Sequence, residues 1–128
     1  MREILFRGKR VDNGEWVYGV PTKDEHGELS FLPCQFYDIR GTICLYVDEN
    51  TVGQFTGLTD KNGKKIFEGD ILLKGFEKVL VKWNSNQCRW SIYSDGYEIC
   101  GFNESTQGYF EVIGNIYDNS ELLEELKK

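Results

Sequence analysis

Glu68 and Asp70 are the residues whose types and spacing come closest to a reactive pair in this sequence. On an extended segment they would share one face, where paired carboxylates act as general acid and base or hold a hard cation. No histidine or third acidic residue stands close to them. A turn-stabilising role, in which the carboxylates accept hydrogen bonds from backbone amides, therefore competes with chemistry and is favoured.

The single histidine and the cysteines form no recognisable reactive pattern. His26 lies in a polar segment, KDEHGE at 23–28, and we expect an exposed loop side chain rather than a general base. The four cysteines, none in a C-x-x-C pair, are Cys34, Cys44, Cys88 and Cys100. Zinc sites usually show closely spaced ligands, and these cysteines are widely spaced. We see no secretory signal, which would favour disulfides. We expect free, buried thiols and no metal or cofactor.

Composition and charge exclude several classes of protein. A hydrophobic content of 40% and a charged content of 28% in 128 residues are typical of one globular domain. No apolar run is long enough to cross a membrane, and the N-terminus lacks the apolar core of a signal peptide, so we expect a cytoplasmic protein. The net charge of −6 opposes general affinity for nucleic acid.

The distribution of lysines nevertheless leaves a local basic face open. Six lysines lie between positions 61 and 82, and they are Lys61, Lys64, Lys65, Lys74, Lys78 and Lys82. On a strand over 78–83, Lys78 and Lys82 would lie opposite Trp83. A row of lysines beside exposed aromatic rings is the arrangement that binds single-stranded nucleic acid.

The aromatic residues are expected mainly in the core. Phe55 is a core residue in this interpretation, with a role as an exposed recognition anchor as the alternative. Core packing is also favoured for Trp83 and Trp90. Three tyrosines could instead form an aromatic surface, and these are Tyr93, Tyr97 and Tyr109.

The pattern of turns and short strands predicts a mainly β protein. Turn dipeptides such as Asn13-Gly14, Asn62-Gly63 and Asp95-Gly96 recur between short alternating or β-branched runs. Strands are expected at 15–20, 78–83, 89–93 and 111–117. Many short strands favour a barrel-like architecture in a single domain. That domain would have two β lobes, 1–58 and 66–117, joined by the polar 59–65 turn, and a helix over 119–128 capped by Asn119 or Ser120.

A longer motif carries a family resemblance. The run from Thr51 to Leu72 reads TVGQFTGLTDKNGKKIFEGDIL, and it resembles the signature of the YopX family, small proteins encoded mostly by phages and prophages. Residues 2–7, REILFR, and 112–123, VIGNIYDNSELL, look like that family's opening strand and its closing strand and helix. Ser120 stands where the family often has proline, which affects only the helix start.

The resemblance implies a predominantly β fold, a phage context inside a bacterial cell and self-association, and it transfers no catalytic residue. The Glu-Gly-Asp element is similar to the entry into SH3-like barrels, so the C-terminal half is expected to be SH3-like. The motif residues are then structural, and they are Gly53, Gly57, Gly63, Glu68, Gly69 and Asp70.

Three hypotheses on function follow. The first is a non-catalytic module that works by protein contact, as a homo-oligomer or on a host or phage protein. The alternative is a nucleic-acid-binding module that uses the six lysines. The third is an enzyme whose site includes Glu68 and Asp70.

Overall fold

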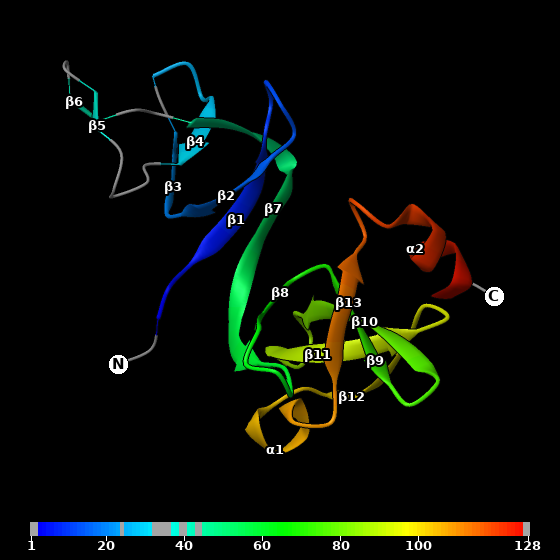
Figure 1. Cartoon of the computed structure of the whole chain (residues 1–128). Helices are drawn as coiled ribbons and strands as arrows, with labels where there is room; N and C mark the ends of the chain where they lie inside the picture. The colour runs from blue at the N-terminus through cyan, green and yellow to red at the C-terminus, as the bar shows by residue number, and fades with distance from the viewer. Residues whose placement is uncertain (1–2, 24, 32–36, 39–40, 43–44, 127–128) are drawn as a thin grey trace. The chain divides into compact units, whose positions relative to one another are not determined.

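The computed structural model describes residues 3–23, 25–31, 37–38, 41–42 and 45–126. Within them the chain is mainly β, with two antiparallel sheets, a two-stranded ribbon and two short helices (Figure 1). It divides into two compact units, residues 1–55 and 56–128. The division falls inside one long strand, β7 (Leu45–Thr59), a few residues before the predicted polar turn.

The first unit is built on the sheet order β2–β1–β7–β4–β3. Its strands besides β7 are β1 (Phe6–Arg10), β2 (Trp16–Gly19), β3 (Pro21–Lys23) and β4 (Leu29–Phe31). A separate ribbon pairs β5 (Tyr37–Asp38) with β6 (Gly41–Thr42). Phe31, Val47 and Phe55 are buried here, so Phe55 is a core residue and not an exposed recognition anchor.

The second unit carries a five-stranded antiparallel sheet in the order β12–β11–β10–β9–β13, and β8 (Lys65–Phe67) pairs with β7. The strands are β9 (Asp70–Lys74), β10 (Glu77–Asn84), β11 (Arg89–Ser94), β12 (Tyr97–Gly101) and β13 (Glu111–Asn115). The helices are α1 (Glu104–Gln107) and α2 (Ser120–Leu126). Each strand expected in this half of the chain is therefore present.

Alternation along the strands builds the core of this unit. In β10, Val79 and Val81 are buried while Lys82 is exposed, which matches a sheet with one covered face. The core cluster contains Leu58, Ile66, Leu72, Val79, Val81, Trp90, Ile92, Phe102 and Phe110. Burial of each large aliphatic or aromatic side chain contributes about 1.5–3 kcal/mol, so this cluster is the main source of the unit's stability.

The predicted barrel does not close. The sheet order of the second unit is an open path, and the described residues show no pairing between its two outer strands, β12 and β13. The amide of Val112 in β13 donates instead to the Asp60 carboxylate, and the amide of Lys61 donates to the Phe110 carbonyl. The turn after β7 thus occupies hydrogen-bonding groups of the segment that a closing strand would need.

The exposure of Trp83 differs from the prediction that it packs in the core. Trp90 is buried, but Trp83 is 44% exposed because β10 extends beyond the core at that end. The two residues are partners in the β10–β11 register, and their rings pack edge-to-face with centroids 5.1 Å apart. Trp83 therefore covers Trp90 from the solvent side.

Candidate functional site

Asp60 is the centre of the turn within the Thr51–Leu72 motif. Its Oδ1 accepts hydrogen bonds from the amides of Asn62 at 2.8 Å and Lys64 at 2.9 Å, and its Oδ2 accepts one from Val112 at 3.0 Å. Burial pushes the pKa of this carboxyl upward, but the three amide hydrogen bonds outweigh it and hold the pKa below its usual value. The residue therefore works as an ionised hydrogen-bond acceptor that ties the β7–β8 turn to β13.

The Glu68-Gly69-Asp70 element is a turn and not an extended segment. Gly69 has φ +89°, a conformation that side-chain-bearing residues rarely adopt, and it separates β8 from β9. Asp70 is 1% exposed and accepts a hydrogen bond from the Phe67 amide at 2.8 Å, whereas Glu68 is half-buried. The two carboxylates consequently do not share one strand face, and the environment of Asp70 supports a structural role.

The other motif glycines occupy special backbone positions as well. Gly57 and Gly63 have φ +87° and +82°, and Gly63 ends the Asp60 turn as expected. Gly53 lies in β7, where it pairs with Arg7 of β1 in the first unit. The motif thus places its glycines at a strand pairing, a distortion of β7 and two turns.

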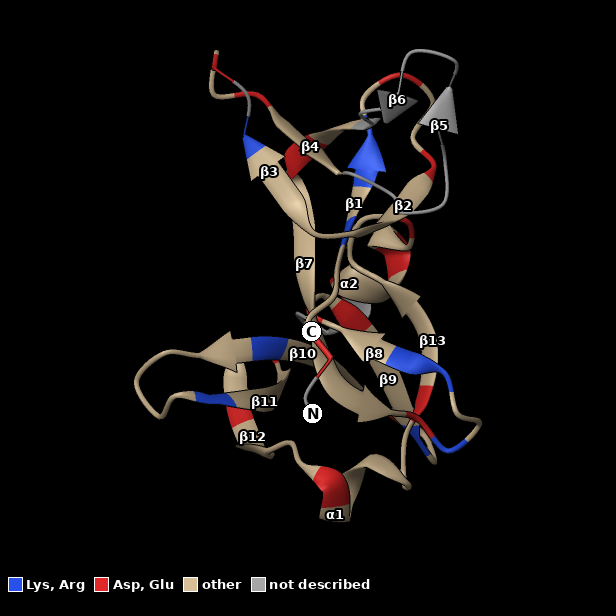
Figure 2. Cartoon of the chain, turned by 90° about the vertical axis from the view of Figure 1, so that its left-hand side faces the viewer, with Lys and Arg blue, Asp and Glu red and all other residues tan. Residues whose placement is uncertain are grey.

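The six lysines lie on several elements and form no single row. Lys61 and Lys64 are in the β7–β8 turn, Lys65 begins β8, Lys74 ends β9, and Lys78 and Lys82 are on β10. Figure 2 shows basic and acidic positions interspersed along the ribbon. Lys61 lies 3.7 Å from the Glu111 carboxylate, which reduces its value as a contact for an anionic partner.

Two of these lysines lie over tyrosine rings. The Nζ atoms of Lys74 and Lys82 are each 5.2 Å from a ring centroid, that of Tyr109 and that of Tyr93 respectively. Tyr93 belongs to β11, Tyr97 begins β12, and Tyr109 follows α1, so the three tyrosines come from different elements. The structure therefore supplies two separate lysine–tyrosine pairs.

A charged network on β10, β11 and β12 was missed by sequence reasoning. The guanidinium of Arg89 donates to Glu98 at 2.7 Å, and the side-chain amide of Asn84 donates to the other carboxylate oxygen. A Cβ on Gly101 would lie 3.2 Å from Arg89 Cδ, so the glycine makes room for the arginine. Only the strand register, with its irregularity beside Tyr93, brings these residues together.

Ionisation in this network follows from its hydrogen bonds. Those from Arg89, Asn84 and Ser91 hold the pKa of Glu98 below its usual value. Burial raises the pKa of Tyr93, and the nearby Glu98 carboxylate raises it further. Glu98 is therefore a charged acceptor at neutral pH, and Tyr93 is a neutral phenol.

Among the residues that the structure describes, the other reactive side chains show no assembled site. His26 is an exposed loop residue, 3.5 Å from Glu25. Cys88 and Cys100 are free thiols as expected but are exposed rather than buried, because one lies in a turn and the other on the outer strand β12. Cys34 and Cys44 lie outside the described residues. Among the described residues, no group of His, Cys, Asp or Glu is arranged to hold a metal ion.

Comparison with known proteins identifies the family. The model of the YopX protein family matches residues 5–124, nearly the whole chain. The chain belongs to the YopX family. The Asp60 turn and the Glu68-Gly69-Asp70 turn therefore lie within a stretch that this YopX-family chain shares with its family model.

A solved structure shows the same fold. The YopX-family chain is similar to protein EF1440 from Enterococcus faecalis, with a TM-score of 0.60 and 22% sequence identity over 96% of this chain and 99% of that one. At that identity the likeness establishes a common architecture. No curated protein matches the chain. No helix within the described ranges is long and apolar enough to cross a membrane.

Proposed function

We propose that this YopX-family chain is a non-catalytic module that works by protein contact, first of all with copies of itself. It would serve as an accessory protein of a phage or prophage in the cytoplasm of the bacterial host. One observation carries the proposal: large apolar side chains lie outside a well-filled core in the second unit. Aromatic side chains are enriched at the contact sites between proteins.

Residues 56–128 leave several large apolar side chains exposed. Five of them are between 44% and 104% exposed, and they are Phe76, Trp83, Tyr97, Ile99 and Tyr109. Four are aromatic, the type that most often supplies the binding energy of an interface. Covering even two of them would contribute about 3–6 kcal/mol before the costs of association.

Light scattering coupled to size exclusion tests this proposal, over a concentration series from micromolar to millimolar and at low and high salt. We expect a discrete oligomer whose mass is unchanged by salt, because apolar contacts are not screened. A chain that stays monomeric throughout the series would overturn the self-association part of the proposal.

Nucleic-acid binding is a second candidate function, which the two lysine–tyrosine pairs favour. Lys74 over Tyr109 and Lys82 over Tyr93 place a cation beside an aromatic ring, the combination that stacks bases and neutralises phosphates. The overall charge of −6 opposes it. Fluorescence anisotropy with a pool of short single-stranded nucleic acids tests this function. Binding through these lysines should weaken steeply as the salt concentration rises, and it should also weaken in a K74A/K82A variant. Affinity unaffected by either change would exclude these lysines as the contact.

A further inference from the structure

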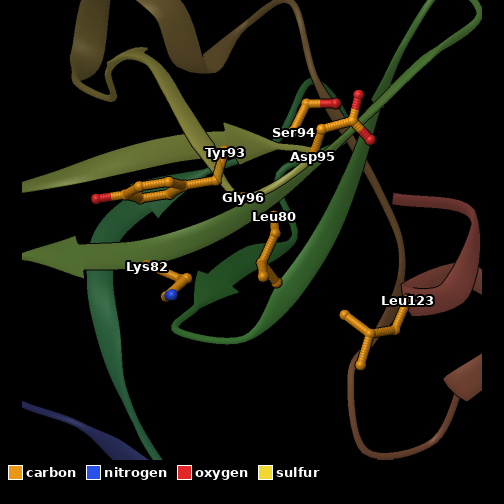
Figure 3. A pocket seen from close by; sticks show the side chains of 7 residues that line it. All are labelled: Leu80, Lys82, Tyr93, Ser94, Asp95, Gly96 and Leu123. Atoms are coloured by element: carbon orange, nitrogen blue, oxygen red, sulfur yellow. The ribbon is translucent and has the colours of Figure 1, made fainter. Parts of the chain in front are cut away.

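A small pocket opens between the outer side of the five-stranded sheet and α2. Its volume is about 230 Å³. Leu80 and Tyr93 line it from β10 and β11, and Leu123 from α2, as Figure 3 shows. Lys82 and Asp95 also line it and supply one charge of each sign. The pocket therefore suits an apolar group about the size of one side chain.

A protruding aromatic side chain lies on the same part of the chain. Phe76 stands in the tight turn between β9 and β10 and is fully exposed, at 104% of its reference area. It is flanked by Lys74 and Glu77, which face each other in the strand register. A phenylalanine fully exposed to water at the tip of a hairpin adds nothing to the folded core, and its ring is available to a partner.

We propose that Phe76 of one copy of the chain enters the Leu80–Leu123 pocket of a second copy. The inference deepens the proposed self-association by naming its contact, and it rests on that proposal. The ring matches the pocket in size and apolar character. The charges match too, because Lys74 and Glu77 beside the ring are opposite in sign to Asp95 and Lys82 beside the pocket.

In the proposed contact the two copies form a closed dimer. Phe76 directly precedes β10, and Leu80 and Lys82 belong to β10. A two-fold axis beside this strand exchanges both rings at once, so each copy gives a phenylalanine and receives one. Two aromatic rings buried in this way remove about 300–500 Å² of ring surface from water, at 150–250 Å² each.

Substitutions on the knob and in the pocket test the contact in the full-length chain. Phe76→Ala removes the ring, and Ser94→Phe adds bulk at a residue that lines the pocket. Tyr18→Ala is the matched control, because Tyr18 is an exposed aromatic residue on β2 of the first unit. We expect F76A and S94F each to raise the dimer dissociation constant at least tenfold, and Y18A to change it less than threefold, by light scattering or sedimentation.

The outcomes separate this inference from the broader proposal. If the wild type associates and F76A and S94F associate equally well, the Phe76 contact is wrong and self-association stands. A wild type that is monomeric at every concentration overturns both.

Photo-crosslinking gives a second measurement that does not depend on affinity. With p-benzoylphenylalanine at position 76 and a mixture of light and heavy-isotope chains, we expect cross-links between copies, mapped to 80–96 or to Leu123. The same amino acid at position 18, in the first unit, is the control and should not label that segment. Cross-links from position 76 confined to other segments would overturn the contact.

Discussion

Asp60 accepts a hydrogen bond from the amide of Val112, 52 positions away in the chain, at 3.0 Å. The same carboxylate holds the amides of Asn62 and Lys64 in its own turn. One side chain in the family motif thereby joins a local turn to a strand near the C-terminus. Removing this carboxylate would leave three backbone amides without these part-buried hydrogen bonds.

Asp60→Asn is expected to lower the free energy of unfolding by about 1–3 kcal/mol. Asparagine offers one carbonyl oxygen in place of two, and its amide would face a backbone N–H donor. Urea unfolding measures the loss. Asp95→Asn is the matched control, because Asp95 is exposed and asparagine also adopts its positive φ of 54°. Equal losses in the two variants would contradict the role of Asp60.

The destabilisation by Asp60→Asn should depend on pH. Folding lowers the pKa of Asp60, so its ionisation contributes stability that is present above the unfolded-state pKa, about 3.9. That contribution is lost as the pH falls through the lower folded-state pKa. The difference in unfolding free energy between wild type and D60N should therefore narrow in acid, as measured by urea unfolding at a series of pH values. A constant difference would show that ionisation of Asp60 adds nothing.

Asp70→Asn and Glu68→Gln are expected to differ sharply. Asp70 is buried and accepts the Phe67 amide, so its replacement should cost about 1–3 kcal/mol of stability. Glu68 is half-buried, and its replacement should stay within about 0.5 kcal/mol. Thermal or urea unfolding measures both. A D70N variant as stable as wild type would remove the structural explanation of Asp70 and reopen a chemical role for the pair.

Gly114→Ala should loosen α2. A Cβ at Gly114 would lie 2.4 Å from Asn119 Oδ1, the atom that accepts the Asn115 amide hydrogen bond just before the helix. Displacing Asn119 should cost about 1–2 kcal/mol, and the amides of Leu122 and Leu123 should exchange faster with deuterium. Gly108→Ala is the control, since Gly108 has φ −68° and open space around it. If G114A and G108A behave alike, this packing constraint is wrong.

Glu98→Gln should lower the pKa of Tyr93 toward the ordinary value of 10.0. The negative carboxylate disfavours the tyrosinate, and glutamine removes that charge while the burial stays. The shift can be followed by NMR of ring-labelled tyrosine. Glu104→Gln, on the short helix α1, is the control and should leave Tyr93 unchanged. Identical titrations in E98Q and wild type would mean that burial alone raises this pKa.

Local patterns predicted most of the elements of the second unit. Alternation in β10 and β11, the Asn62-Gly63 turn and the polar start of α2 depend on neighbours a few residues apart, and the structure has each of them. The exposed thiols of Cys88 and Cys100 and the exposed ring of Trp83 could not be predicted in the same way. Their exposure depends on where the core ends, which is a property of the assembled sheet.

The sequence by itself determined the family, the mainly β class and the positions of the turns, because glycine, asparagine and alternating apolar residues act over short range. Only the tertiary structure decided that the sheet of the second unit stays open, that Glu98 meets Arg89 and Asn84, and that Leu80 and Leu123 leave a pocket between them. These features depend on strand register and on contacts between residues far apart in the chain. A one-residue irregularity in register changes which side chains meet, and no local pattern encodes it.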